Sequence, residues 1–174
     1  MEKIFYAEKN AFPTSISAVE KILSTYFDIT APKISRTDNG KPYLENPEKR
    51  LFFSVSHTKT ALFIAFSDEN VGLDAEKLAR EVNYTSILRK FPVEEREEIK
   101  TAEDFLRLWT VKESTVKWLG GTLAQDLGKL SYHQGVLRYK ELELPLHVTT
   151  MFFHDHVLSI CGERNFSHAE FIPL

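Results

Sequence analysis

The apolar and polar positions of the first seventy residues alternate with two different periods. Residues 3–7 alternate as a β-strand does, whereas 14–27 space their apolar residues three and four apart, as in an amphipathic helix. Thr14 or Ser15 is the expected N-cap of that helix. Further β-rich segments, one of them interrupted by an Asp-Asn-Gly turn, cover 33–45, 51–57 and 61–67.

The remainder of the chain shows the helical period first and the strand period afterwards. Helices are predicted over 83–91, 92–100 and 102–120, the last ended by a Gly-Gly pair. Antiparallel strands are predicted over 129–142, 147–153 and 156–163. The fold class predicted is therefore α+β, with two similar halves, 1–70 and 71–174, each packing a helix on a small antiparallel sheet within one compact domain.

Composition narrows the classes of protein to which the chain can belong. A length of 174 residues suits one hydrophobic core, and a formal net charge of −3 argues against a nucleic-acid partner. The single cysteine, Cys161, excludes an intrachain disulfide, and neither a signal peptide nor an apolar membrane span is apparent. We therefore expect a soluble protein of the cytoplasm with no membrane partner.

Two acids stand one residue apart in the otherwise apolar predicted strand VGLDAEK, residues 71–77. Asp74 and Glu76 lie at i and i+2, so their like charges share one face of the strand. Two interpretations are open. The strand is half-exposed and both acids are solvated, or the pair holds a divalent cation, because hard oxygen ligands on a rigid strand suit Mg²⁺.

The predicted helix 102–120 carries Trp109, Glu113 and Lys117 four residues apart, close to one stripe. In isolation, Glu113 and Lys117 form a favourable exposed pair. Beside the two acids of the strand, Glu113 is instead a candidate third carboxylate ligand. Lys117, one turn further on, is then a candidate contact for a phosphate group.

The segment FFSVSHTKT, residues 52–60, places Ser56 and His57 on opposite faces of a predicted strand. His57 is either a structural histidine or, with Ser56 and backbone N–H groups, part of a phosphate site at the strand end. A serine hydrolase is disfavoured because no Gly-x-Ser-x-Gly motif is present. His154 and His156 also allow a zinc site, although polar residues flanking a turn explain them more simply.

Four motifs follow one another in a fixed order, namely NGKPY (39–43), SVSHT (54–58), VGLDAE (71–76) and LWTVKESTVKWLGG (108–121). This ordered set resembles that of the 4′-phosphopantetheinyl transferases, and most closely that of the Sfp-type, single-chain members. The family pattern is Gly-Lys-Pro, then Asn/Ser-x-Ser-His-Ser/Thr, then Gly-hydrophobic-Asp-x-Glu, and last Trp-x-x-Lys-Glu-x-x-x-Lys. One motif alone would be a weak signal, whereas four in sequence are a specific one.

The resemblance implies a pseudodimer of two α/β halves with coenzyme A bound as substrate in the cleft between them. It implies Mg²⁺, with Mn²⁺ as an alternative, held by Asp74, Glu76 and Glu113. The residues that it directs to coenzyme A are Gly40, Lys41, Pro42, Ser56, His57, Lys112 and Lys117. The catalytic residues that it implies are Asp74, Lys117 and, as general base, Glu95, with Glu94 as a near rival.

The implied reaction is an in-line attack on the β-phosphorus of coenzyme A by a serine hydroxyl of an apo acyl or peptidyl carrier protein. The leaving group is 3′,5′-ADP, and the charge of the transition state would be stabilised by Mg²⁺, Lys117 and either Lys112 or His57. Relatives present an Arg and nearby basic residues to the 3′-phosphate from the first helix, where this chain has only Lys21.

Carrier proteins are acidic helical bundles, so a locally basic surface is expected on the transferase. We place much of it on the segment 82–100, with Arg89, Lys90 and Phe91. Two different half-sites within one chain favour a monomer. Whether the carrier serves fatty-acid, polyketide or peptide synthesis is left open by the sequence.

Two other functions use the same residues. A Mg²⁺-dependent phosphohydrolase would employ the three acids with water in place of serine. A binding module would hold coenzyme A or a carrier protein without transferring anything.

Overall fold

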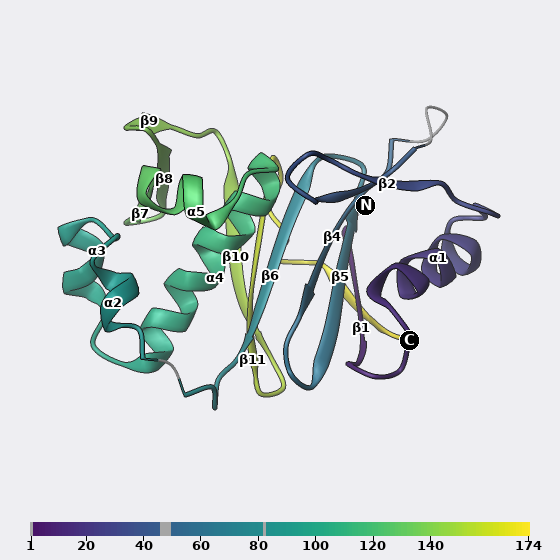
Figure 1. Ribbon diagram of the computed structural model, residues 1–174, viewed down its shortest axis with the longest axis horizontal. Helices are drawn as coiled ribbons and strands as arrows, with labels where there is room; N and C mark the ends of the chain where they lie inside the picture. The colour runs from purple at the N-terminus through teal and green to yellow at the C-terminus, as the bar shows by residue number, and fades with distance from the viewer. Residues whose placement is uncertain (1, 46–49, 82) are drawn as a thin grey trace.

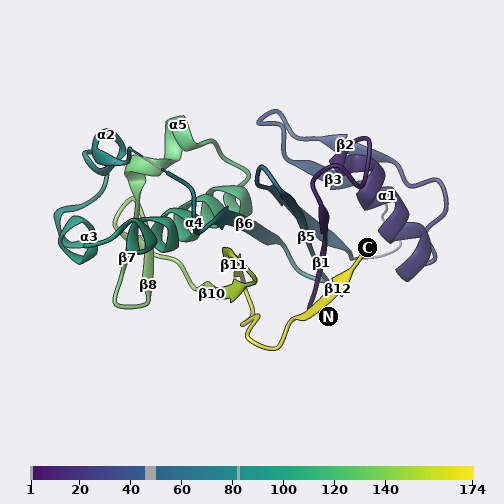
Figure 2. The same ribbon diagram turned by 90° about the horizontal axis from the view of Figure 1, so that it is seen from below.

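Four layers stack across the molecule in the order helix, sheet, sheet, helix (Figures 1 and 2). The computed structural model describes residues 2–45, 50–81 and 83–174. The outer layers are α1 (Ser15–Tyr26) and α4 (Ala102–Leu119). The sheet beside α1 has the strand order β12 (Glu170–Pro173), β1 (Glu2–Glu8), β5 (Ala61–Ser67), β4 (Phe52–His57). The sheet beside α4 has the order β10 (His147–Phe153), β11 (His156–Gly162), β6 (Val71–Lys77). The protein is thus α+β, as predicted.

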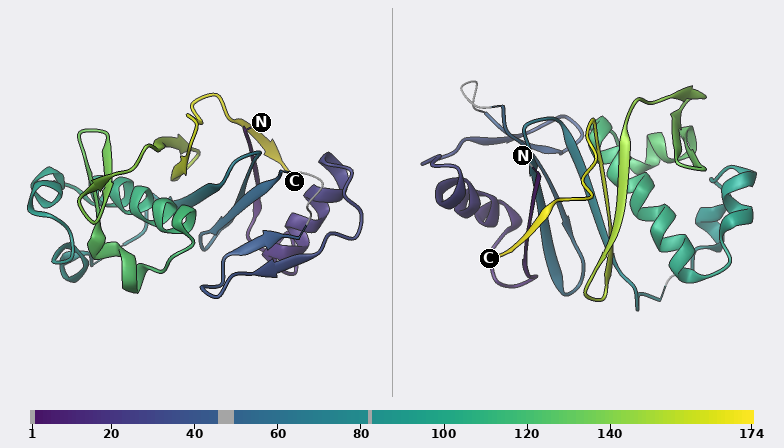
Figure 3. Two further views of the ribbon diagram at one scale, coloured as in Figure 1. Left: turned by 90° about the horizontal axis from the view of Figure 1, so that it is seen from above. Right: turned by 180° about the vertical axis from the view of Figure 1, so that it is seen from behind.

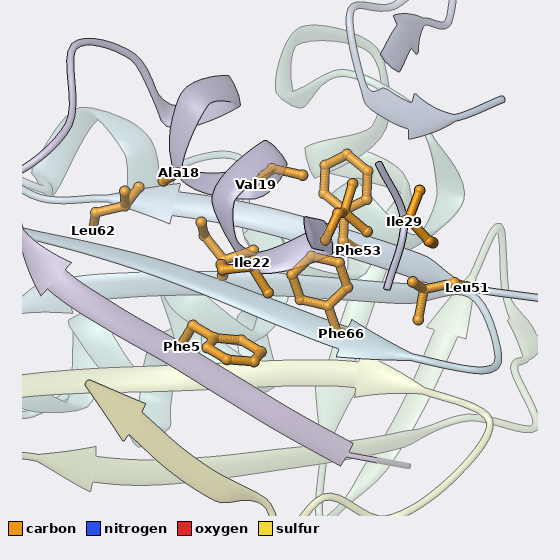
Figure 4. Close-up of a cluster of buried hydrophobic side chains, with 11 residues drawn as sticks. Phe5, Ala18, Val19, Ile22, Ile29, Leu51, Phe53, Leu62 and Phe66 are labelled. Carbon is orange, nitrogen blue, oxygen red and sulfur yellow. The ribbon is translucent and has the colours of Figure 1, made fainter. Parts of the chain in front are cut away.

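Strand β5 is apolar from Ala61 to Phe66 because both of its faces are covered. Ile64 and Phe66 pack against α1, in the cluster drawn in Figure 4, whereas Phe63 and Ala65 pack against β6 and β11. All four side chains are at most 1% exposed. A run of consecutive apolar residues is therefore expected here in place of the alternation of a half-exposed strand.

The two long helices begin and end where the sequence predicts. Thr14 caps α1 and forms a reciprocal capping box with Ser17, and Thr101 does the same for α4 with Asp104. Gly120 ends α4 in the left-handed conformation, with φ of 66°. These caps set where each helix begins and where α4 ends.

Smaller elements surround this framework. A two-stranded ribbon, β2 (Ile34–Arg36) and β3 (Pro42–Leu44), precedes β4. The two helices predicted before α4 are present but shorter, as α2 (Thr85–Leu88) and α3 (Val93–Glu98). After α4 come α5 (Leu123–Asp126), η1 (Leu127–Lys129), and a small sheet of β7 (Leu130–His133), β8 (Val136–Tyr139) and β9 (Leu142–Glu143).

The C-terminal strand β12 crosses back to the first sheet and pairs in parallel with β1 (Figure 3). Neither this strand nor helix α5 was predicted from the sequence. Within the described ranges, no helix is both long and apolar enough to cross a membrane.

Candidate functional site

Three acidic side chains converge between β6 and α4. Val71, Leu73 and Ala75 face the apolar core between the sheets, so the alternating positions of β6 face α4. Asp74 and Glu76 on that face are 4% and 9% exposed. Carboxylate oxygens of Asp74, Glu76 and Glu113 lie within 4.8 Å of one another. These three residues are called the acidic triad below.

Gly72 explains how the helix comes so close to the strand. A Cβ atom at this position would overlap the backbone carbonyl oxygen of Ser114 and lie 2.6 Å from the backbone nitrogen of Trp118. Helix α4 therefore crosses directly over Gly72, where no other residue fits without moving the helix backbone. This crossing places Glu113 and Lys117 beside Asp74.

Lys117 supplies positive charge to the triad from helix α4. Its Nζ donates hydrogen bonds to Asp74 Oδ1 at 2.8 Å and to the Leu73 carbonyl oxygen at 2.9 Å. The Arg80 guanidinium pairs with Glu76 from the solvent side. The other Asp74 oxygen, Oδ2, is buried and has no hydrogen-bond partner among the described residues.

The neighbouring cations do not fully stabilise the ionised form of the acidic triad. Burial, and next the Asp74 carboxylate, raise the pKa of Glu113 to about 8, and burial raises the pKa of Glu76 despite its contact with Arg80. A divalent cation would satisfy the unpartnered oxygen of Asp74 and favour the ionised form of Glu113. Closely spaced carboxylate oxygens are the ligands that Mg²⁺ prefers, so the residues present fit this metal.

The structure decides between the interpretations of these residues that the sequence left open. The half-exposed strand is wrong, because Asp74 and Glu76 are buried. The exposed pair of Glu113 and Lys117 is also wrong, since Lys117 bonds to Asp74. Within residues 2–45, 50–81 and 83–174 there is no second group of three or more convergent His, Cys, Asp or Glu side chains, which removes support from a zinc site at His154 and His156.

Ser54 and Ser56 join the edge strands of the two sheets. Ser54 Oγ accepts a hydrogen bond from the Leu73 N–H at 2.9 Å, and Ser56 Oγ accepts one from the Ala75 N–H at 3.1 Å. Ser56 also donates to Asp74 Oδ1 at 2.9 Å. Ser56 is thus buried against the triad, whereas His57 lies exposed on the other face of β4, as the alternation predicts.

The Gly-Lys-Pro motif lies next to the C-terminal end of α4. Gly40, Lys41 and Pro42 share a cavity of about 220 Å³ with Lys117, and the Asn39 side-chain amide donates to the Gly120 carbonyl oxygen at 2.8 Å. Lys41 Nζ donates to Asn70 Oδ1 and to the Val71 carbonyl oxygen. Burial lowers the pKa of Lys41 to about 8. The structure therefore brings the first and the last of the four motifs together.

His57 opens into a larger groove, of about 1050 Å³, that also reaches Glu76. The cations Lys9, Lys59, Lys77 and Arg80 line this groove together with the acids Glu76 and Glu81, and none of these four cations was assigned a site role from the sequence. Burial, and then the ammonium groups of Lys9 and Lys117, lower the pKa of His57. The groove therefore has a positively charged wall beside the triad.

A sequence signal for these cations does exist. Both β1 and β4 run antiparallel to β5, and the bonds of Ser54 and Ser56 pair β4 with β6 in parallel order. The carboxyl ends of these three strands therefore lie at one edge, and Lys9, Lys59 and Arg80 each follow one of them within four residues. Basic residues just beyond parallel strand ends would have indicated the groove.

Glu95 and Lys112 are not brought to the triad. They form an ion pair of 2.8 Å in which both side chains are 0% exposed. Lys112 Nζ also donates to the Leu130 carbonyl oxygen, and Glu95 Oε1 accepts from the Tyr132 N–H. Burial raises the pKa of Glu95 and lowers that of Lys112. The near rival, Glu94, is exposed.

The expected docking segment is only partly a surface. Residue 82 lies outside the described residues, and Arg89 and Lys90 are exposed. Phe91 is 3% exposed and packs in the core, with the Lys112 ammonium 4.6 Å from its ring centroid. Its expected place on the docking surface is therefore wrong, because its ring covers the buried ion pair.

Comparison with known proteins agrees with this geometry. The family model of the 4′-phosphopantetheinyl transferase superfamily matches residues 70–164, more than half of the chain, including both motifs that bear the triad. The chain is 31% identical over 121 residues to 4′-phosphopantetheinyl transferase AcpT of Escherichia coli (strain K12), covering 65% of this chain and 62% of the relative.

Two further relatives cover more of this chain. Slr0495 of Synechocystis sp., provisionally named a 4′-phosphopantetheinyl transferase, is 25% identical over 146 residues, which are 78% of this chain and 59% of the relative. The 4′-phosphopantetheinyl transferase ffp of Bacillus subtilis is 25% identical over 181 aligned positions, covering 92% of this chain and 78% of the relative. The chain thus spans about three fifths of the length of the E. coli and Synechocystis proteins. From the family match and the convergence of its motifs, the chain belongs to the 4′-phosphopantetheinyl transferase superfamily.

Proposed function

We propose that this protein transfers the 4′-phosphopantetheine group of coenzyme A to a serine hydroxyl of an apo acyl or peptidyl carrier protein, releasing 3′,5′-ADP. The observation that carries the proposal is the acidic triad, buried between β6 and α4 beside Lys117 in a member of this superfamily. Its relatives in E. coli and B. subtilis are named 4′-phosphopantetheinyl transferases.

Asp74, Glu76 and Glu113 are the residues that would hold Mg²⁺, or Mn²⁺ in its place. The bound metal would supply positive charge to the pyrophosphate of coenzyme A. Lys117 would add positive charge near the same pyrophosphate, because its ammonium group contacts Asp74 and its side chain lines the cavity of the Gly-Lys-Pro motif. Removing Lys117 should therefore slow transfer by roughly 10²- to 10³-fold, the scale of a lost oxyanion donor.

The nucleotide would lie across the junction of β4 and β6. Gly40, Lys41 and Pro42 line the cavity that we assign to the adenylate, and His57 opens into the groove assigned to the phosphates. These residues come from 1–70, whereas the triad comes from 71–174. This division supports a pseudodimer of two halves with coenzyme A bound between them.

Three residues directed to the reaction receive other roles. Ser56 holds the Asp74 carboxylate by a hydrogen bond from within the fold. Glu95 and Lys112 are sealed together at 0% exposure, so we assign this ion pair to the fixing of α4 against β7. Direct acceptance of the serine proton by Glu95 would first require this pair to open.

The carrier protein is expected on the exposed face that carries Arg89 and Lys90, where acidic helices would find complementary charge. We propose that the protein acts as a monomer, since both half-sites are present in one chain. We also propose that it acts in the cytoplasm. Charge reversal at Arg89 and Lys90 should raise the KM for the carrier in a salt-dependent manner and leave the KM for coenzyme A unchanged.

The decisive experiment incubates the protein with coenzyme A, Mg²⁺ and a panel of apo carrier proteins, followed by intact-protein mass spectrometry. We expect one phosphopantetheine added to a carrier, and none with EDTA, with Glu113→Gln, or with a carrier whose serine is replaced by alanine. Release of 3′,5′-ADP without a mass gain would indicate a phosphohydrolase. Binding of coenzyme A with neither product would indicate a binding module.

A further inference from the structure

Arg80 reaches the acidic triad from a turn that folds back on the end of β6. The Arg80 N–H donates to the Lys77 carbonyl oxygen at 2.9 Å, and the Leu78 N–H donates to the Asp155 carbonyl oxygen at 2.9 Å. The backbone of the turn is therefore fixed to the neighbouring hairpin. The side chain of Arg80 is 47% exposed while that of Glu76, its ion-pair partner, is 12% exposed. The guanidinium thus covers the mouth of the triad.

We infer that Arg80 is an exchangeable counter-ion of the triad, which Glu76 gives up when it binds the divalent cation and which then binds the anionic substrate. This inference rests on the proposed function. One Glu76 carboxylate serves either a guanidinium or a metal ion far better than both, because the two cations repel each other. The half-exposed side chain of Arg80 can move without disturbing the core.

The released guanidinium has a destination close by. Arg80 lines the groove that also holds Lys9 and Lys59, and in the part of the chain that the structure describes these two lysines have no ion-pair partner. Such a concentration of unpaired positive charge favours an anion. A planar guanidinium can donate two parallel hydrogen bonds to one phosphate, as a lysine cannot.

Two couplings follow from this exchange. Without substrate, Arg80 competes with the metal for Glu76 and weakens metal binding. With the metal in place, Arg80 is free and strengthens the binding of coenzyme A. Metal and coenzyme A should therefore each increase the affinity for the other by the same factor.

The test measures Mn²⁺ binding by calorimetry, and by the electron paramagnetic resonance signal of free Mn²⁺, in three proteins without coenzyme A. These are the wild type, Arg80→Gln and a matched control, Lys77→Gln. Lys77 lines the same groove and pairs with Asp155 at 3.0 Å, so its loss removes the same charge without touching Glu76. We expect Arg80→Gln to bind Mn²⁺ roughly two- to fivefold more tightly than Lys77→Gln, the scale of a partly exposed ion pair.

A second measurement follows coenzyme A at saturating Mn²⁺. Arg80→Gln should bind coenzyme A at least about threefold more weakly than Lys77→Gln, and Arg80→Lys should recover part of the loss. Equal Mn²⁺ affinities in the two glutamine variants would overturn the role of Arg80 alone. Absence of Mn²⁺ binding in the wild type would overturn the metal site and, with it, the proposed function.

Discussion

Replacement of Gly72 by alanine tests whether the crossing of α4 over β6 builds the site. The added Cβ atom would overlap the Ser114 carbonyl oxygen and lie 2.6 Å from the Trp118 backbone nitrogen. Ordinary contacts of a Cβ atom begin at 3.4 Å. Both obstacles are helix backbone, which cannot rotate away as the end of a side chain can. Helix α4 must therefore retreat from the sheet by roughly 1 to 1.5 Å.

The expected destabilisation follows from this displacement. Overpacking of a well-packed interior typically costs about 1 to 3 kcal/mol, and more when backbone has to move. The retreat also loosens contacts along a helix that covers both β6 and β11. We therefore expect Gly72→Ala to lower the free energy of unfolding by about 2 to 4 kcal/mol. Glu113 moves with the helix, so Mn²⁺ binding should weaken by roughly tenfold or more, an energy of about 1.4 kcal/mol.

Urea unfolding and Mn²⁺ calorimetry check both numbers against Gly128→Ala. A Cβ atom at Gly128 would meet nothing within 4 Å, so this control should stay within about 1 kcal/mol of the wild type and bind the metal normally. If Gly72→Ala matched the control in stability and in Mn²⁺ affinity, α4 would not rest on Gly72. The explanation of how Glu113 reaches Asp74 would then fail.

Three more variants test other parts of the site. Lys9→Met should weaken coenzyme A binding by roughly three- to tenfold, with a smaller loss at high salt, whereas Lys21→Met on α1 should not. Calorimetry at two salt concentrations measures both variants. Equal affinities of the two variants for coenzyme A would show that Lys9 has no role. Glu95→Gln should lower the free energy of unfolding by about 3 to 5 kcal/mol, because it leaves a buried ammonium unpaired. The control Glu94→Gln, at an exposed residue, should leave stability unchanged. If Glu95→Gln instead kept its stability but reduced turnover at least about 100-fold, Glu95 would be the general base. The pKa of Lys41 falls from 10.5 to about 8 on folding. Between these pH values the unfolded chain binds more protons than the folded one, so stability should rise with pH by up to about 1.4 kcal/mol per pH unit. Urea unfolding at a series of pH values should show this rise in the wild type and its loss in Lys41→Met.

Periodicity predicted the main helices and strands because the buried face of each element requires apolar residues at a regular spacing. The spacing of apolar residues and the Thr14 cap predict α1, and Gly120 marks the end of α4. Strand β12 was missed, since four residues ending at Pro173 carry too little alternation to be distinguished from a loop. The stacking of the two sheets depends on which faces meet, and a strand pattern does not state this.

The sequence predicted which residues form the acidic triad, but not that they are buried. The shared face of Asp74 and Glu76 follows directly from the period of a strand. Their burial does not, because it is imposed by α4, which begins at residue 102, 25 residues after β6 ends at residue 77. The adjacent Gly72 was the available indication, since a glycine within a strand often marks a close approach of another backbone. Arg80 was missed because it comes from a turn, where periodicity carries no information.

The junction of β4 and β6 connects the geometry of the triad to the fold of both sheets. Edge strands usually pair through backbone ladders, but here the Ser54 and Ser56 hydroxyls accept the Leu73 and Ala75 N–H groups. The second hydroxyl also donates to Asp74, on the oxygen that Lys117 contacts. That carboxylate is therefore held by a strand from each sheet and by α4 at once. Its other oxygen, Oδ2, is buried without a hydrogen-bond partner among the described residues, so the position of a bound metal would depend on the packing of both sheets and of α4.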